Sequence, residues 1–205
     1  MFIIGITGGT GAGKTTAVKA LQSLGASALD CDEIYHELLL SNIDMNSDIK
    51  ARFNDVSING SVDRRKLGEI VWNDPASLRD LNSITHDYVS REIKQHLIAL
   101  KRKGAKLVTI DAIALIESGQ SRKCNIVVGV VASPEKRLLR IMDRDNLTKE
   151  CAMLRVNAQQ PESFYRENCD YILENVYDSQ AAFEKRCLEF FRNLIPLKRS
   201  TPLKV

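Results

Sequence analysis

The chain has 205 residues, of which 44% are hydrophobic and 27% charged, and its formal net charge is +3 at pH 7. This is enough apolar material for a substantial core, in one domain with insertions or in one large and one small domain. The charge is too small to indicate a nucleic-acid partner, and no stretch approaches the roughly twenty apolar residues of a membrane span. The first residues lack the charged start of a signal peptide, so we expect a cytoplasmic protein that binds neither nucleic acid nor membrane.

The strongest signal is a phosphate-binding motif near the N-terminus. The apolar run 2–6 predicts a short buried strand, and residues 16–24 have the apolar spacing of a helix. Between them, residues 8–15 read GGTGAGKT and fit the pattern G-x-x-x-x-G-K-[ST] without a mismatch. Strand, loop and helix therefore follow in the order that a nucleoside triphosphate site requires. The alternative is a glycine-rich turn that matches the pattern by accident.

Each residue type in this loop answers a physical need. Glycines allow backbone conformations that turn successive N–H groups inward around phosphate oxygens, and the start of the next helix attracts anions. Lys14 can bring a cation to the β- and γ-phosphates, and the Thr15 hydroxyl can ligate Mg²⁺. We therefore predict that the triphosphate is bound by Gly9, Thr10, Gly11, Ala12, Gly13, Lys14, Thr15 and Thr16.

Further strands and helices alternate along the chain. Apolar runs predict four more strands at residues 26–30, 107–111, 126–131 and 171–173. The segment between the second and third strands is far longer than one crossover helix, and helical patterns are expected there at residues 48–53, 65–72, 75–84 and 86–103. The alternation predicts an α/β protein of the P-loop NTPase fold, with a parallel five-stranded sheet flanked by helices.

The same pattern divides the chain into three parts. We expect a nucleotide-binding core formed by residues 1–31, 105–135 and 168–205, and a helical acceptor-binding subdomain at residues 32–104. Residues 136–167 are interpreted as a helical lid. Its first helix is expected to begin at Pro134, with Ser133 as N-cap, and to end near Asp145, and a second helix is expected to begin near Thr148.

Two predicted strands end in carboxylates, at the sheet edge where open α/β sheets bind ligands. Asp30 and Asp32 follow the second strand, and Asp32 could accept a proton from an attacking hydroxyl. Asp32 also precedes a helical segment, so the spacing leaves a helix N-cap equally open. Asp111 ends the third strand and could hold Mg²⁺ through water, with a solvated strand end as the alternative.

Four arginines fall on the two predicted lid helices: Arg137, Arg140, Arg144 and Arg155. Guanidinium groups on a mobile helical pair could close over a triphosphate, neutralise charge in the transition state and exclude water. Any one of them could simply be solvated on a polar helix face. As a set they indicate a lid, with Arg144 and Arg155 as its preferred members.

Together these segments resemble the dephospho-CoA kinase family over nearly the whole chain. The resemblance is carried by residues 4–16, 29–38, 62–72, 81–86, 144–145, 155–159 and 169–175. It implies that ATP, with Mg²⁺, phosphorylates the ribose 3′-hydroxyl of dephospho-CoA to give CoA and ADP. It also implies that Asp32 is the base and that Lys14 and Arg144 offset charge on the transferred group. Arg64 and His86 would then lie toward the acceptor.

Two positions depart from the family pattern. Ile113 and Asp87 stand where family members commonly carry proline, and the resemblance places both near the acceptor pocket. Two other functions compete with this reading: another small-molecule or nucleotide kinase, and a non-catalytic P-loop regulator. The guanine-specificity pattern Asn-Lys-x-Asp is absent from the sequence, which argues against a GTPase switch. A monomer or a small homo-oligomer is expected.

Overall fold

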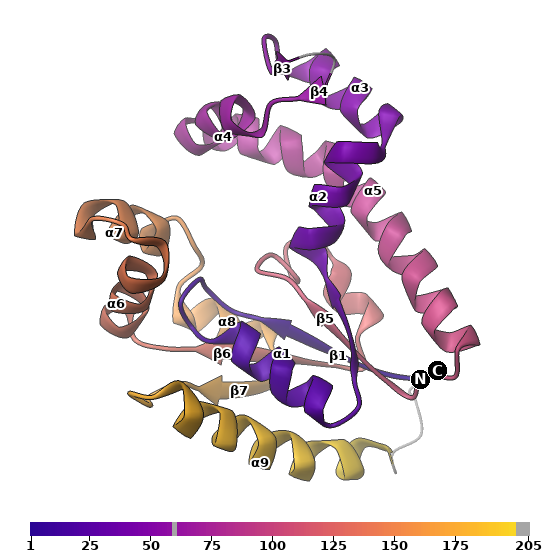
Figure 1. Cartoon of the computed structure of the whole chain (residues 1–205), viewed down its shortest axis with the longest axis vertical. Helices are drawn as coiled ribbons and strands as arrows, with labels where there is room; N and C mark the ends of the chain where they lie inside the picture. Colours follow the sequence, from indigo (N-terminus) through magenta and orange to yellow (C-terminus); the bar gives the residue numbers. More distant parts are fainter. Residues whose placement is uncertain (59–60, 200–205) are drawn as a thin grey trace. The chain divides into compact units, whose positions relative to one another are not determined.

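The computed structural model describes residues 1–58 and 61–199, and the chain divides into two compact units (Figure 1). The first unit contains residues 1–29 and the chain from residue 101 onward, and the second contains residues 30–100. Residues 59–60 of the predicted acceptor subdomain and 200–205 of the predicted core lie outside the described residues. Each unit is a separate body with its own core.

The first unit is built on a five-stranded sheet in the order β2-β5-β1-β6-β7. Its strands are β1 (Phe2–Thr7), β2 (Ser27–Asp30), β5 (Leu107–Asp111), β6 (Ile126–Val131) and β7 (Tyr171–Glu174). In the parallel register, Ile6 of β1 pairs with Asp111 of β5 and with Val128 of β6. All five predicted strands and the parallel α/β fold are confirmed. The central strands are buried on both faces, so they appear in the sequence as continuous apolar runs.

Helices α1 (Lys14–Ser23) and α9 (Gln180–Arg199) pack against each other along one face of this sheet (Figure 1). The core between them contains the fully buried side chains of Ile4, Ile6, Leu21, Phe183 and Phe191. Burying side chains of this size stabilises a fold by roughly 1.5–3 kcal/mol each. The helices and the sheet therefore give the loop after β1 a rigid base.

The remaining elements of the first unit follow β5, β6 and β7. They are the short η1 (Gln120–Lys123), α6 (Pro134–Asp145), α7 (Lys149–Asn157) and α8 (Glu162–Asn168). Helices α6 and α7 pack on each other, and α8 packs on β6 and β7. The predicted start of α6 is confirmed, because the Ser133 side chain accepts a hydrogen bond from the Lys136 N–H at 3.3 Å. Thr148 caps α7 in the same way.

The second unit is helical apart from one short hairpin. It contains α2 (Cys31–Ser41), α3 (Ile43–Arg52), β3 (Ser57–Ile58), β4 (Ser61–Val62), α4 (Arg64–Asn73) and α5 (Pro75–Arg102), whose last two residues belong to the first unit. Met45, Ile49 and Ile93 are completely buried in its core. Tyr88 Oη donates to Asp48 Oδ2 at 2.6 Å and links α5 to α3. The antiparallel β3–β4 hairpin was absent from the sequence prediction, because two-residue strands leave no periodic signal.

Helix α5 is longer than predicted. The sequence predicts a break between residues 84 and 86, but the helix is continuous from Pro75 to Arg102. Its buried face continues through the gap, with Leu81, Thr85 and Val89 at four-residue spacing. Thr85 fits this face because its hydroxyl donates back to the Leu81 carbonyl at 2.9 Å. The predicted break is therefore wrong, and neither proline nor glycine occurs there to cause one.

The start of α2 resolves one alternative that the sequence left open. The N-cap is Asp30, whose Oδ1 accepts hydrogen bonds from the N–H groups of Asp32 at 2.8 Å and Glu33 at 3.2 Å. Asp32 is the second residue inside the helix, and it is exposed. The interpretation of Asp32 as an N-cap is therefore wrong. Two carboxylates close together in the sequence have different structural positions.

Removal of the Asp30 cap provides a direct test of this assignment. Asp30→Ala is expected to lower the free energy of unfolding by about 1 kcal/mol, because two N–H groups in the first turn lose their acceptor. Asp30→Asn is the matched control, since asparagine caps about as well as aspartate and should cost far less. Urea unfolding of both variants measures the difference. Equal loss of stability in the two variants would contradict the capping role.

Candidate active site

The phosphate-binding loop joins β1 to α1 in the first unit. Three of its glycines have positive φ angles: 138° at Gly8, 79° at Gly11 and 113° at Gly13. Residues with a Cβ rarely adopt this region. A Cβ on Gly13 would also lie only 2.6 Å from Asn175 Nδ2 and 2.8 Å from Phe183 Cε1. Both the backbone conformation and the available space therefore require glycine at residue 13.

Lys14 and Thr15 are the first two residues of α1. They lie in the first turn, where the helix dipole and the N–H groups of a helix start attract anions. The Lys14 side chain is partly buried, the Thr15 side chain is exposed, and Thr16 is buried against the core. The structure thus brings the predicted loop residues together at the carboxyl end of a central strand, where α/β sheets bind ligands.

Asp111 lies beside the strand that leads into this loop. It is the last residue of β5 and pairs in register with Ile6 of β1. The next turn is also tied to β1, because Thr7 Oγ1 donates to the Ile113 carbonyl at 2.9 Å. This hydrogen bond uses the backbone of Ile113, so it does not depend on the side chain that replaces the usual proline. Asp111 and the loop therefore belong to the same edge of the same sheet.

The oxygen atoms at this edge are of the kind that Mg²⁺ prefers. Thr15 supplies a hydroxyl and Asp111 a carboxylate, and Mg²⁺ usually takes one or two protein ligands together with water and phosphate oxygens. Within the described part of the chain, no group of three or more His, Cys, Asp or Glu side chains could hold a metal ion by itself. The donors present fit a metal that is shared with a phosphate, as Mg²⁺ is in ATP sites.

The four predicted lid arginines form two pairs. Arg137 and Arg140 of α6 bond to the loop backbone, where Arg137 Nε donates to Thr10 O at 2.9 Å and Arg140 Nη1 donates to Gly11 O at 3.1 Å. Because Arg137 is 8% exposed, the solvated interpretation is wrong for this residue. These two arginines therefore fix the loop through its backbone carbonyls.

Arg144 and Arg155 share a carboxylate at the α6–α7 connection. Arg144 Nε donates to Asp145 Oδ1 at 2.7 Å, and Arg155 Nη1 donates to Asp145 Oδ2 at 2.7 Å. The hydrogen bond from Arg144 is the largest of the effects that lower the pKa of Asp145. The side chains of Arg144 and Arg155 are 59% and 45% exposed, so both are accessible to solvent, unlike that of Arg137.

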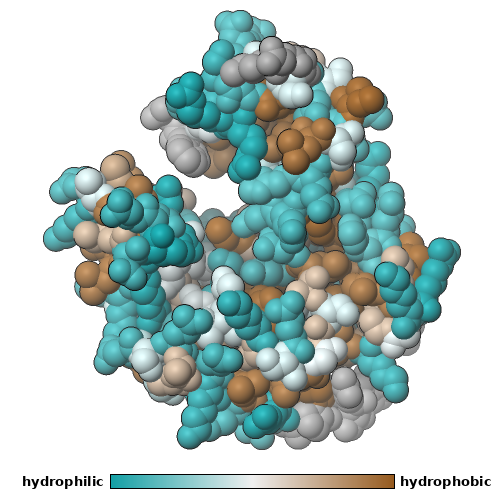
Figure 2. Space-filling view, viewed as in Figure 1, coloured by the Kyte–Doolittle hydropathy of each residue, from teal (hydrophilic) through white to brown (hydrophobic). Residues whose placement is uncertain are grey.

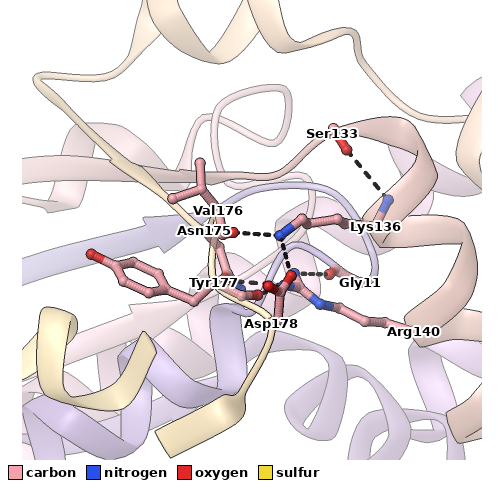
Figure 3. Close-up of polar contacts among 8 residues, drawn as sticks. All are labelled: Gly11, Ser133, Lys136, Arg140, Asn175, Val176, Tyr177 and Asp178. Atoms are coloured by element: carbon pink, nitrogen blue, oxygen red, sulfur yellow. Dashed lines mark hydrogen bonds and ion pairs between the residues drawn. The ribbon is translucent and has the colours of Figure 1, made fainter. Parts of the chain in front are cut away.

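A second network joins α6 to the segment that follows β7 (Figure 3). Arg140 Nη2 donates to Asn175 Oδ1 at 3.2 Å, and Lys136 Nζ pairs with Asp178 Oδ1 at 2.7 Å. Asn175 is 4% exposed, and its Nδ2 donates to the Ala12 carbonyl at 2.8 Å. Asn175 therefore connects the loop to Arg140. Sequence reasoning did not assign Asn175 to the site, although it belongs to the 169–175 segment of the resemblance.

The remaining predicted site residues lie in the second unit. Asp32 is in the first turn of α2, Arg64 is the first residue of α4, and His86 is half-buried inside α5. His86 is therefore not at the start of a helix, as the predicted break had placed it. Arg64 Nη2 contacts Nε2 of His36, which lies one turn after Asp32 on α2. This contact brings Arg64 to the helix that carries Asp32.

Sequence reasoning did not single out Tyr35 and His36, which the structure places beside Arg64. Burial raises the pKa of Tyr35, and the charge of Arg64 partly offsets that increase. A histidine four residues after Asp32 lies on the same helix face, and this spacing was the available signal. Only the fold of the unit, which brings the start of α4 to α2, shows that Arg64 is the partner of His36.

The surface of α6 and α7 is mixed in character. Figure 2 shows hydrophobic residues among hydrophilic ones on the visible face of this helix pair, at the left of the view. Leu139 and Leu154, which belong to these helices, are 64% and 70% exposed. Across residues 1–58 and 61–199, none of the helices combines the length and the apolar character needed to cross a bilayer.

Comparison with known proteins decides between the functions that such a loop could serve. The sequence model described as dephospho-CoA kinase matches residues 2–181. The chain belongs to the dephospho-CoA kinase family. A dephospho-CoA kinase from Dehalococcoides mccartyi is 35% identical over 181 residues, covering 85% of this chain and 89% of the relative. One from Arabidopsis thaliana is 31% identical over 199 residues, covering 95% and 86%.

Solved structures agree with this family membership. A Thermus thermophilus protein superposes with a TM-score of 0.79 at 30% identity, covering 95% of this chain and 97% of that one. Dephospho-CoA kinase from Campylobacter jejuni has a TM-score of 0.66 at 25% identity, with 94% and 96% covered. A shikimate kinase from Acinetobacter baumannii, at 0.52 and 18% identity with 95% and 94% covered, shares the fold alone. The chain is thus a kinase of the dephospho-CoA kinase family, and its reaction is the ATP-dependent phosphorylation of dephospho-CoA to CoA.

Two glycine substitutions test the geometry of the loop. Gly13→Ala is expected to lower the free energy of unfolding by more than about 1 kcal/mol and to weaken ATP binding, because φ is positive there and the added Cβ has no room. Gly68→Ala in α4 is the matched control: its Cβ would meet open space, so it should raise stability by up to about 1 kcal/mol. Urea unfolding and calorimetric ATP titration measure both effects. A Gly13→Ala variant with normal stability and ATP affinity would contradict the requirement for glycine at residue 13.

Proposed function

We propose that this chain transfers the γ-phosphoryl group of ATP to the ribose 3′-hydroxyl of dephospho-CoA. The observation that supports the ATP site most directly is the positive-φ glycine loop between β1 and α1, followed immediately by Lys14 and Thr15. Such a loop directs backbone N–H groups toward phosphate oxygens. Family membership indicates that the acceptor is dephospho-CoA. The second unit, residues 30–100, is the proposed acceptor-binding part of the chain.

In this proposal, residues 9–16 bind the phosphates of ATP. Lys14 places an ammonium group against the β- and γ-phosphates, and the first turn of α1 adds its dipole. Thr15 and Asp111 would hold Mg²⁺, which supplies positive charge that offsets the charge on the transferred group. These are positioning and electrostatic roles, and they account for most of the catalysis in phosphoryl transfer.

Arg144 and Arg155 are the proposed lid residues that contact the triphosphate. Their guanidinium groups are exposed, and Asp145 holds both in one place. Because both guanidinium groups are about half exposed, a phosphate oxygen can reach them and replace the Asp145 carboxylate. Phosphate accepts the same forked hydrogen bonds as carboxylate, so one geometry serves both partners. Arg144 is thereby assigned to offset charge that develops during transfer.

Asp32 is the proposed base that orients or deprotonates the acceptor hydroxyl. It lies in the first turn of α2, where the capping hydrogen bonds are made by Asp30. A carboxylate at this exposed position can accept a proton from a hydroxyl. Arg64 and His86, from the same unit, are proposed to bind the acceptor, with the Arg64 guanidinium directed to its pyrophosphate. We further propose that the enzyme works in the cytoplasm, as a monomer or a small homo-oligomer.

A mass-resolved assay tests this function directly. Purified protein is incubated with ATP, Mg²⁺ and dephospho-CoA, with AMP in place of the acceptor and no acceptor as parallel controls. The expected result is Mg²⁺-dependent formation of CoA in step with ADP, and fragmentation of the product should place the new phosphate on the ribose 3′-oxygen. ADP without CoA, or faster phosphorylation of AMP, would contradict the proposed acceptor.

A single substitution tests the role of Asp32. Asp32→Asn is expected to lower kcat by about 10²-fold or more, because the amide cannot accept the hydroxyl proton. The Kd for ATP and the melting temperature should stay close to their wild-type values, since the carboxamide has the same size. Asp30→Asn serves as the control and should keep most of the activity. Unchanged turnover in Asp32→Asn would remove Asp32 from the mechanism.

A further inference from the structure

Two side chains, Arg137 and Gln159, bind the phosphate-binding loop at Thr10. The proposed reaction gives neither of them a role. Gln159 follows the end of α7, and its Oε1 accepts from the Thr10 N–H at 2.8 Å while its Nε2 donates to Thr10 Oγ1 at 2.7 Å. Arg137 Nε donates to the Thr10 carbonyl, and Arg137 Nη2 contacts Gln159 Oε1. The N–H, the carbonyl and the hydroxyl of Thr10 are therefore all bonded to this pair.

The same two side chains leave no room for a Cβ at the neighbouring residue, Gly9. A Cβ on Gly9 would collide with the guanidinium of Arg137 and lie 2.8 Å from Gln159 Oε1. Unlike Gly8, Gly11 and Gly13, Gly9 is not among the glycines with positive φ. Space for the Arg137–Gln159 pair, rather than backbone conformation, is thus the reason for glycine at this position. The pair fits the Gly9–Thr10 corner closely.

The charge of Arg137 provides a second argument. This residue is 8% exposed, and none of the salt bridges between described residues includes it. Its hydrogen-bond acceptors are the Thr10 carbonyl and the Gln159 carboxamide, which carry no net charge. A buried cation without a carboxylate partner is costly. Beside an anion-binding loop, its charge attracts the ligand and offsets that cost when the ligand binds.

We propose that Arg137 and Gln159 are positioning residues for ATP. They hold the Gly9–Thr10 corner in the conformation that binds the triphosphate, and they tie that corner to the end of α7. The inference rests on the proposed role of the loop as the ATP site. A corner that is already ordered spares ATP binding the cost of ordering it. Loss of the pair should therefore weaken ATP binding while leaving the acceptor unaffected.

A double-mutant cycle tests the pair. Gln159→Leu and Thr10→Val each remove the hydrogen bond from Gln159 Nε2 to the Thr10 hydroxyl at nearly constant volume. Gln159→Leu also removes the acceptor of the Thr10 N–H, and Gln160→Leu is the matched control at the adjacent glutamine. For each variant we would measure the Kd and KM for ATP, the KM for dephospho-CoA and the melting temperature. Gln159→Leu is expected to raise the Kd and KM for ATP about tenfold or more, because it removes the hydrogen bonds of Gln159 to the Thr10 N–H, the Thr10 hydroxyl and Arg137. Its KM for dephospho-CoA should stay within twofold.

The control variant and the double variant show whether the effect is specific to the Gln159–Thr10 contact. Gln160→Leu should stay within twofold of wild type in every constant. The double variant should lose less than the two single variants combined, because both remove the same interaction. Should Gln159→Leu fail to fold, Thr10→Val, which removes only the hydrogen bond at the Thr10 hydroxyl, should still raise the KM for ATP.

Each failure has a distinct meaning. If wild-type protein does not bind ATP, the proposed function of the loop itself is overturned. If wild type binds ATP and the Gln159 and Thr10 variants bind it equally well, the positioning role is overturned and the ATP site stands. A lower melting temperature with unchanged ATP affinity of the folded protein would also overturn it, because the pair would then serve stability alone.

Discussion

A loop that binds phosphate through its backbone N–H groups must direct its carbonyls elsewhere, and carbonyls removed from water need donors. In this chain the carbonyls of Thr10, Gly11 and Ala12 accept hydrogen bonds from Arg137, Arg140 and Asn175 in turn. These donors come from the region that follows β6 and β7, so the loop is completed by residues far away in the sequence. Correct folding of the C-terminal half of the first unit is thus a condition for the phosphate site.

The arginines of α6 and α7 form two groups, which differ in the hydrogen-bond partners of their guanidinium groups. Arg137 and Arg140 donate to backbone carbonyls of the loop, and burial lowers the pKa of both. Arg144 and Arg155 have exposed side chains, and both are bonded to the Asp145 carboxylate. An arginine bonded to loop carbonyls supports the conformation of the loop, whereas the proposed lid arginines would exchange their carboxylate partner for phosphate.

In the second unit, the two carboxylates at the start of α2 also differ in their hydrogen bonds. Asp30 makes the capping hydrogen bonds at the start of α2, and Asp32 lies two residues later, in the first turn of the helix. The contact between Arg64 and His36 links α4 to α2 within this unit. The capping role therefore belongs to Asp30, and Asp32 is left for the proposed role of base.

Much of this protein was determined by local sequence. The loop could be recognised because its chemistry needs eight consecutive residues in one order, and the strands because buried parallel strands are continuously apolar. Ser133 followed by Pro134 predicted the start of α6, since a cap depends on residues three apart. The roles of Asp32, Arg64 and His86 in the reaction remain predictions.

Other features were decided only by tertiary structure. Arg137, Arg140 and Arg144 all lie on one face of α6, so their spacing could not show which of them holds the loop. Asp30 and Asp32 are equally good caps by residue type, and only the path of the chain from β2 selects Asp30. Helix α5 continues past residue 85 because a packed face supports it. Gln159 meets Thr10 across 149 residues of chain, and a contact between such distant residues leaves no trace in local periodicity.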